Sequence, residues 1–409
     1  MRRALDRNAY LCLLAITFFT AIGNTGLISI MPAIGRVIGI SDTLVASIFS
    51  LSALVWATAS PWWARVADRR GRKPLILVGL VGFAGSMVGC GVAIHAGLAG
   101  LLAPASTFAC FFLVRASYGL FGSASATASQ AYVADRTEGF SRVRALSGQA
   151  GALSLGTIVG PALAPFLILP PLALAMPMFL FGAVGLVVLA MSAWMIPPEA
   201  RRQAGGAGDA GAAPSRMWRD AQVAPFFRFG IILASAQAMN LYTLGFVVID
   251  RLGGAPIAAQ KAVGLAMVGG ALASLIAQWV VVGWFRLTPT AMTQWGGALA
   301  AAGNLLMMAG ADYASLAAGF AIASFGYGLG RPGFAAGASL AAGATEQGRV
   351  AGTVSSIAGA SIVAPPIVAV LLYEWWTPAP FVLASAALAA ITVYSLRNPA
   401  ISAVRPNVS

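Results

Sequence analysis

The chain has 409 residues, of which 59% are hydrophobic and 9% are charged, and its mean hydropathy is +0.84. Soluble domains carry roughly 25% charged residues, so this composition excludes a soluble protein and indicates a bilayer as the solvent. The formal net charge is +13. Because the basic residues fall in short loops and do not gather on one face, nucleic-acid binding is not expected.

Apolar stretches of roughly 20 residues, the length that crosses a bilayer as a helix, recur along the whole chain. The first has no small-residue cleavage site, so it is interpreted as a retained span and not as a signal peptide. Twelve spans are predicted, over residues 9–31, 44–63, 74–95, 103–125, 145–169, 172–196, 226–249, 261–285, 291–311, 315–338, 350–373 and 379–396. The predicted fold class is an all-α integral membrane protein with twelve transmembrane helices.

The loops between these spans differ strongly in basic residues. Of the 25 lysines and arginines, Arg36, Arg251 and Lys261 fall in loops on one side, and Arg115 and Arg331 fall inside spans. The remaining 20 (25 minus 3 minus 2) lie in the loops and tails on the other side. Because short cytoplasmic loops carry the excess of positive charge, both termini are predicted to be cytoplasmic.

A long non-apolar stretch separates the sixth span from the seventh. Its Gly- and Ala-rich run at 204–208 has the composition of a flexible linker. We expect a cytoplasmic linker over residues 201–224, between an N-terminal six-helix bundle, 1–200, and a C-terminal six-helix bundle, 225–409.

The two halves share short matches at corresponding spans. The matches are Tyr118-Gly119-Leu120 with Tyr327-Gly328-Leu329, and Arg144 to Pro161 with Arg349 to Pro366, the last two each 17 residues apart. They predict a duplicated six-span unit, an architecture for alternating access around a central site. An oligomeric scaffold or a channel is the alternative interpretation.

The loop between the second and third spans carries a recognisable pattern of charges. Together with twelve spans, a 6+6 repeat and a central linker, it resembles the major facilitator superfamily, whose loop signature is Gly-x-x-x-Asp-Arg-x-Gly-Arg-Lys. Ala64 replaces the first glycine, and the matching positions are Asp68, Arg69, Gly71, Arg72 and Lys73. In this family the acid and arginine belong to a cytoplasmic charge cluster that latches the outward-open state. The resemblance therefore implies a conformational gate at these residues, with Asp135 as a further member; the alternative is that the charges only set topology.

The fifth span contains a second family pattern, with Gly156, Gly160 and Pro161 followed by Ala164 and Pro165. It resembles the antiporter motif of the superfamily, Gly-x-x-x-Gly-Pro-x-x-Gly-Gly, with its last two glycines replaced. Small residues four positions apart allow close helix approach, and the proline kinks the span. The motif implies the twelve-span drug:proton antiporter branch, which includes multidrug and tetracycline-type efflux proteins.

Arg115 occupies the place of an intramembrane arginine motif of the family, Arg-x-x-Gln-Gly-x-Gly, in which Tyr118 here replaces the glutamine. A mid-bilayer arginine costs roughly 2.5–3.5 kcal/mol on insertion scales, so it should face protein or a watery cavity. Arg331 lies nearer the cytoplasmic end, where a long side chain can snorkel. An electropositive cavity without a buried acid should favour anionic, zwitterionic or neutral amphiphiles over lipophilic cations.

Further polar residues lie on the first, fourth, seventh and tenth spans, which line the cavity in this superfamily. Helical spacing places the polar residues of the first span on one face, and likewise those of the seventh. The predicted substrate-binding residues are Arg115, Asn24, Thr20, Thr17, Tyr118, Gln237, Asn240, Tyr327 and Arg331. Hydrogen bonding between helices is the alternative role for each Thr and Asn.

None of the twelve acidic residues lies deep in a predicted span. Proton-coupled exporters usually need a titratable group that substrate and proton both reach. Asp250, at the outer end of the seventh span, is the nearest candidate for proton coupling, and Asp42 is the second. The antiporter motif and the missing intramembrane carboxylate therefore point in different directions.

Cys12, Cys90 and Cys110 lie in apolar segments and form neither a disulfide framework nor a metal site. The sequence has no phosphate-binding loop, catalytic-triad pattern or zinc-ligand spacing, so neither an enzyme nor a cofactor is expected. The predicted function is export of a small-molecule substrate by alternating access, in exchange for protons, by a monomer in the bacterial inner membrane. The alternative is a uniporter or symporter for a small organic anion.

Overall fold

The computed structural model describes residues 5–197, 214–285, 287–342 and 346–402, and within them the chain forms helices and no β-strand. The chain divides into two compact units, residues 1–208 and 209–409. The division falls inside the predicted linker, whose residues 201–213 lie outside the described part of the chain.

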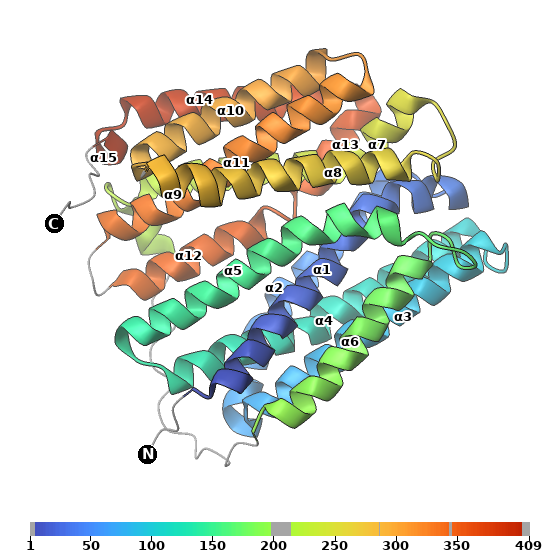
Figure 1. The fold of residues 1–409 in the computed structure, drawn as a ribbon, viewed down its shortest axis with the longest axis horizontal. Coiled ribbons are helices and arrows are strands. Elements are labelled where there is room, and N and C mark those ends of the chain that lie inside the picture. The colour runs from blue at the N-terminus through green and yellow to red at the C-terminus, as the bar shows by residue number, and fades with distance from the viewer. Residues whose placement is uncertain (1–4, 198–213, 286, 343–345, 403–409) are drawn as a thin grey trace. The chain divides into compact units, whose positions relative to one another are not determined.

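The first unit contains six long helices and one short 3-10 turn (Figure 1). They are α1 (Arg7–Ile38), α2 (Asp42–Arg70), α3 (Arg72–Leu98), α4 (Pro104–Arg136), α5 (Gly139–Leu163), the 3-10 turn η1 (Ala164–Leu167) and α6 (Met176–Met195). Within this unit α4 packs between α2 and α3, α3 also packs on α6, and α1 packs on α5 and α6. Leu13, Leu80 and Val133, all 0% exposed, lie in the core that these helices share.

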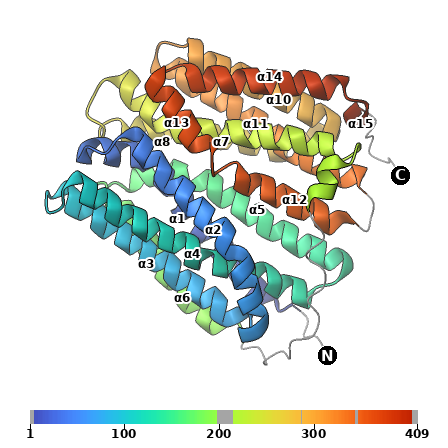
Figure 2. The same ribbon diagram turned by 180° about the vertical axis from the view of Figure 1, so that it is seen from behind.

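The second unit repeats this packing with its own helices (Figure 2). Its elements are the 3-10 turn η2 (Pro214–Arg219), α7 (Ala224–Leu252), α8 (Gln260–Leu275), the π-helical segment η3 (Ile276–Val281), α9 (Val282–Phe285), α10 (Pro289–Ala309), α11 (Tyr313–Ala341), α12 (Gln347–Ala360), α13 (Pro365–Trp375), α14 (Ala379–Arg397) and α15 (Pro399–Ser402). Here α11 packs between α8 and α10, α10 also packs on α14, and α7 packs on α13 and α14. The same pattern of neighbours in both units establishes the predicted pseudo-repeat.

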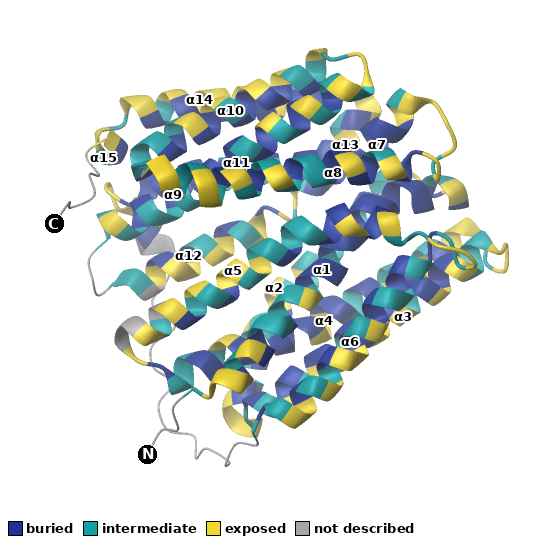
Figure 3. Ribbon diagram, viewed as in Figure 1, coloured by how far each residue is buried: buried dark blue, intermediate teal, exposed yellow. Residues whose placement is uncertain are grey.

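Large apolar side chains on the outer faces of the helices are exposed (Figure 3). Trp194, Trp284 and Trp375 are 94%, 81% and 79% exposed. A water-soluble protein would bury such residues, so these faces are suited to contact lipid.

Ten helical segments are both long and apolar enough to cross a membrane within the described residues. Two further helices, α10 and α11, have 21 and 29 residues, or about 32 and 44 Å of helix at 1.5 Å per residue. These two helices are not among the ten because their hydropathy is lower. The reason is the close contact between them: a Cβ added at Gly303 would lie 2.3 Å from the Ala323 nitrogen, and one at Gly326 would lie 2.4 Å from the Ala300 nitrogen. Small residues let the two backbones touch. The structure is thus consistent with twelve crossings.

Two predicted spans are less regular than the sequence analysis expected. The span predicted over 350–373 is not one continuous helix, because the chain leaves the helix between α12 and α13 (Figure 2). Pro365 and Pro366 follow the break, and a proline has no N–H to donate to the carbonyl groups of the preceding turn. The span predicted over 261–285 contains the π-helical segment η3, where the Gln278 side chain donates to Ser274 Oγ at 3.0 Å.

The last part of the predicted linker is folded onto the second unit. Met217 of η2 is 5% exposed and belongs to the core of that unit. The ring of Trp218 packs against Phe227 of α7, with 5.6 Å between centroids. Of the linker predicted over 201–224, the described portion from Pro214 onward therefore packs against the second unit.

Candidate functional site

Arg115 is a cation buried within α4, where it is 1% exposed. It lies 11 residues from Pro104 at the start of that helix, or about 16 Å along the axis, which is about half the thickness of a hydrocarbon core. Its Nη2 donates to Oδ1 of Asn24 on α1 at 2.5 Å. Nε and Nη1 are also buried and have no hydrogen-bond partner among the described residues.

Aromatic rings lie beside this guanidinium. The Arg115 Cζ is 4.8 Å from the centroid of the Tyr118 ring, which is one turn further along α4. That ring in turn contacts Trp56 of α2 and Phe83 of α3, at centroid distances of 5.6 and 5.8 Å. The first unit therefore combines one buried positive charge with a surrounding apolar, aromatic wall.

The two predicted threonines of α1 precede Asn24 on the same helical face, and all three side chains are half-buried. The Thr17 hydroxyl donates to the Leu13 carbonyl at 2.9 Å, and the Thr20 hydroxyl donates to the Ile16 carbonyl at 2.6 Å. Each hydroxyl proton is thus used by the helix itself, while the hydroxyl oxygens remain able to accept a hydrogen bond.

The second unit contains a buried polar cluster that has no charge. Asn240 of α7 and Asn304 of α10 both donate to the Tyr327 hydroxyl of α11, at 3.0 and 3.1 Å. The three side chains are 0–1% exposed, and both asparagine Oδ1 atoms lack a hydrogen-bond partner among the described residues. Asn240 and Tyr327 were predicted from the sequence, whereas Asn304 was not. Its amide inside a Gly- and Ala-rich span was the signal available for it.

Two other predicted substrate-binding residues of this unit, Gln237 on α7 and Arg331 on α11, are half-buried. Arg331 follows Tyr327 by one helical turn, so both lie on one face of α11. For these two side chains, the described residues show no hydrogen bond or ion pair. They differ in this respect from the residues of the uncharged cluster.

The predicted gate residues Asp68, Arg72 and Asp135 are in contact in the first unit. Arg72 Nη2 lies 2.7 Å from an oxygen of Asp68 at the end of α2, and Arg72 Nε lies 3.2 Å from an oxygen of Asp135 near the end of α4. The Arg72 side chain is 11% exposed, whereas that of Asp68 is 57% exposed. One arginine therefore links the ends of three helices, since it begins α3.

The remaining loop residues have distinct structural roles. Gly71 joins α2 to α3 with a φ of 89°, a backbone conformation that residues other than glycine rarely adopt. Lys73 Nζ donates to the Ala193 carbonyl near the end of α6 at 2.7 Å, and Arg69 is exposed. The glycine thus fixes the tight turn that brings Arg72 to the two acids.

The glycines of the predicted antiporter motif lie where α5 crosses α1. A Cβ added at Gly156 would come 2.6 Å from the Phe18 carbonyl oxygen, and one at Gly160 would come 2.5 Å from the Ile22 carbonyl oxygen. Pro161 lies inside α5. These contacts show that the motif allows close backbone packing of α1 and α5.

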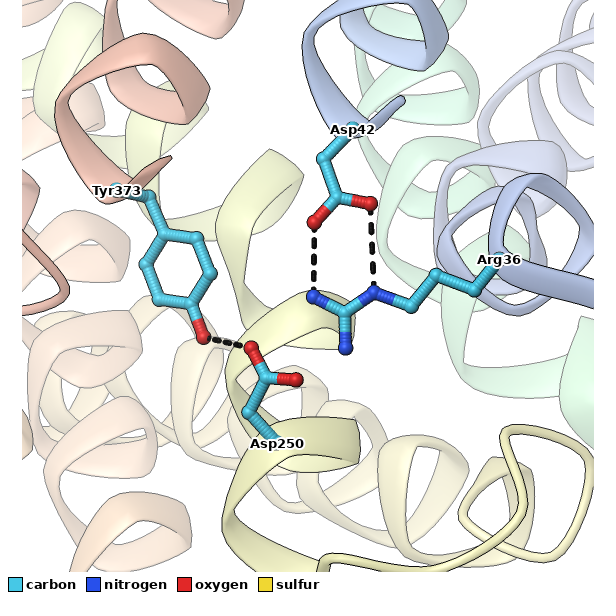
Figure 4. A network of polar contacts seen from close by, with 4 residues as sticks. All are labelled: Arg36, Asp42, Asp250 and Tyr373. Carbon is cyan, nitrogen blue, oxygen red and sulfur yellow. Dashed lines mark hydrogen bonds and ion pairs between the residues drawn. The ribbon is translucent and has the colours of Figure 1, made fainter. Parts of the chain in front are cut away.

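Both candidate proton-coupling carboxylates have partners (Figure 4). Asp42, the first residue of α2, accepts from Arg36 Nε at 3.3 Å and from Arg36 Nη2 at 2.8 Å. Asp250, near the end of α7, accepts a hydrogen bond from the Tyr373 hydroxyl of α13. Asp42 therefore has a charged partner, and the contacts of Asp250 include a tyrosine hydroxyl.

Two helical membrane units of the same architecture, each with polar residues buried inside its spans, define a transporter. A family model described as Major Facilitator Superfamily matches residues 13–359. The chain therefore belongs to the major facilitator superfamily and is not an enzyme.

Similar proteins agree with this family. Multidrug resistance protein 2 of Bacillus subtilis (strain 168) is 26% identical over 191 residues, which cover 47% of this chain and 44% of that protein. Tetracycline resistance protein, class B, of Escherichia coli is 27% identical over 156 residues, 37% of this chain and 36% of that protein. The matches thus span less than half the length of these relatives. The predicted resemblance to drug-efflux proteins is confirmed.

Solved structures show the same fold. The human organic anion transporter MFSD10 (TETRAN) has a TM-score of 0.62 and 20% identity, with 95% of this chain and 99% of that chain covered. A mutant of the nucleoside transporter NupG has a TM-score of 0.70 and 11% identity, with the same coverage of 95% and 99%. At these identities the likeness shows the fold alone.

Proposed function

We propose that this protein exports small amphiphilic molecules of negative, zwitterionic or neutral charge by alternating access, in exchange for protons. Residues 1–200 would rock against residues 225–409 in the inner membrane of a bacterium, with both termini in the cytoplasm and the protein acting as a monomer. The efflux relatives support the direction of transport. The observation that carries the substrate class is Arg115.

A substrate with a negative group complements the first unit. Arg115 offers buried N–H donors that have no partner among the described residues, and Tyr118, Trp56 and Phe83 supply apolar surface next to them. A lipophilic cation would meet the positive charge without a compensating acid. Anionic amphiphiles therefore fit this site better than cations.

The second unit contributes mainly uncharged polar groups as candidates for substrate binding. The orphaned amide oxygens of Asn240 and Asn304 can accept hydrogen bonds, and Gln237 adds another amide on α7. Arg331, one turn from Tyr327, adds a second positive charge. These groups would position the substrate, and the neutral hydrogen bonds of the amides tolerate varied ligands.

Alternating access requires a contact that differs between two conformations. We assign this role to Arg72 with Asp68 and Asp135, supported by their ion pairs at the ends of α2, α3 and α4. For proton coupling, Asp250 near the end of α7 is the first candidate, and Asp42 is the second because its protonation would break its ion pair with Arg36.

The test is flux in proteoliposomes of purified protein, with fluorescein as the anionic probe, a neutral dye and ethidium as the cationic probe. An imposed pH gradient should drive uphill movement of fluorescein with counterflow of protons, and ethidium should move poorly. The matched variants are Arg115→Gln and Arg65→Gln, an exposed arginine on α2. Equal fluorescein transport by the two variants would refute the role of Arg115.

The second candidate function is a uniporter or symporter for a small organic anion. It is favoured by the position of the acids, because those in the described residues lie near helix ends or in loops and none lies in the middle of a long helix. Downhill flux that ignores the pH gradient would support this candidate and would leave the glycine motif of α5 as a packing motif.

A further inference from the structure

The buried charge of Arg115 has no compensating acid in its own unit. The described acids of that unit lie at helix ends: Asp6 and Glu138 cap α1 and α5, Asp42 begins α2, and Asp68 and Asp135 lie near the cytoplasmic ends of α2 and α4. The hydrogen bond to Asn24 comes from a neutral amide, which supplies a dipole and no negative charge.

An arginine side chain stays protonated in proteins, so it cannot escape burial by losing its proton. An isolated ion in a low-dielectric interior is strongly unfavourable, and removing one partner of a buried pair destabilises a protein because a bare charge remains. The face of the guanidinium is covered by Tyr118, but its in-plane donors Nε and Nη1 lack partners among the described residues. The site is therefore built for an anion in the plane of the guanidinium.

We propose that a small monovalent anion, for which chloride is the probe, binds Arg115 in the substrate-free protein and is displaced by the negative group of the substrate. The displacement rests on the proposed function, whereas the resting anion follows from the site itself. A single positive charge selects a monovalent anion, because a divalent one would leave a net negative charge in the same apolar surroundings. Asn24, which accepts from Arg115 Nη2, is itself half-buried on α1.

The anion would be both a counter-ion and a competitor. While it is bound, it removes the cost of the buried charge, and a substrate carboxylate takes over that role. Competition of this kind raises the apparent dissociation constant of the substrate by the factor 1 + [anion]/Kd, which is about tenfold when chloride is present at ten times its own Kd. Chloride should therefore weaken the binding of anionic substrates and leave that of neutral ones unchanged.

The test is the thermal stability of the full chain in detergent, titrated with chloride against gluconate and sulfate at constant ionic strength. Chloride should raise Tm in a saturable way in the wild type and in Arg331→Gln, which removes the other intramembrane cation. Arg115→Gln should show no chloride-specific rise. An equal rise in Arg115→Gln, or no difference between chloride and sulfate in the wild type, would overturn the proposal.

Two further measurements keep the result decisive. If Arg115→Gln does not fold, Asn24→Leu is used in its place. Because this change removes the amide partner of Arg115, the rise of Tm with chloride should be preserved or enlarged. A loss of that rise in Asn24→Leu would contradict the anion site. Titration with formate in the same Tm measurement distinguishes binding of a carboxylate from binding of a halide.

Chloride binding without transport of any dye would support the anion site and refute the proposed function. Dye transport without a chloride effect on Tm would support the proposed function and refute the anion site.

Discussion

Gly119 of α4 and Gly328 of α11 occupy equivalent points in the two units, each against a serine carbonyl of the neighbouring helix. A Cβ added at Gly119 would lie 2.5 Å from the Ser52 oxygen on α2, and one at Gly328 would lie 2.7 Å from the Ser274 oxygen on α8. The glycines of the repeated Tyr-Gly-Leu sequence thus make the same contact twice. Close backbone approach explains why both halves have glycine at this point.

We predict that Gly119→Ala and Gly328→Ala each lower Tm, because the new methyl group meets a backbone atom that has little room to move. Overpacking of this kind costs about 1–3 kcal/mol. The controls are Gly85→Ala on α3 and Gly269→Ala on α8, where an added Cβ meets nothing within 4 Å. Because alanine favours a helix over glycine by about 0.5–1 kcal/mol, the controls should be neutral or stabilising. Equal losses in all four variants would refute the contact.

Arg72→Gln should alter transport more than Arg70→Gln, its exposed neighbour in the same loop. The first change removes the ion pairs to Asp68 and Asp135. If the pairs favour one conformation by about 1.4 kcal/mol, their loss changes the ratio of the two conformations about tenfold. The effect on transport is measured as the initial rate in proteoliposomes. The ratio of the two conformations is measured as the reactivity of a cysteine reporter on each side of the membrane. A normal rate in Arg72→Gln would exclude the gate.

Tyr327→Phe should destabilise the second unit. It removes the oxygen to which Asn240 and Asn304 donate, and a buried amide without a partner costs about 1–3 kcal/mol. Asn304 keeps its bond to the Ala300 carbonyl at 2.7 Å, so Asn240 should be affected most. In a double-mutant cycle, Asn240→Leu with Tyr327→Phe should cost less than the sum of the single changes. Strict additivity would show that the bond contributes nothing.

Asp250→Asn should abolish uphill transport driven by a pH gradient and leave substrate exchange at equal pH intact, because an amide cannot take up the coupled proton. Asp42→Asn is the matched change in the other unit and should retain gradient-driven transport, although loss of the Arg36 ion pair should lower its stability. If Asp42→Asn abolished gradient-driven transport and Asp250→Asn retained it, proton coupling would be assigned to Asp42.

The membrane class and the family could be read from the sequence because they depend on local properties. Long apolar stretches and the loop from Asp68 to Lys73 are contiguous, and neither needs a distant partner to be recognised. The break before Pro365 was missed even though the prolines were visible, because tolerance of a proline inside a span depends on how neighbouring helices satisfy the backbone. Likewise, the low hydropathy of α10 and α11 has its reason only in their mutual backbone contact.

The sequence by itself determined that Arg115 is a cation inside a span and that the acids lie elsewhere, because hydropathy and charge are properties of single positions. Only the tertiary structure decided that Asn24 is its partner and that its Nε and Nη1 have no partner among the described residues. The pairing with Asn24 joins helices whose contacting residues are 91 positions apart in the chain, and it depends on how each helix is rotated and how closely it packs. Those quantities are set by the whole bundle and not by any one segment.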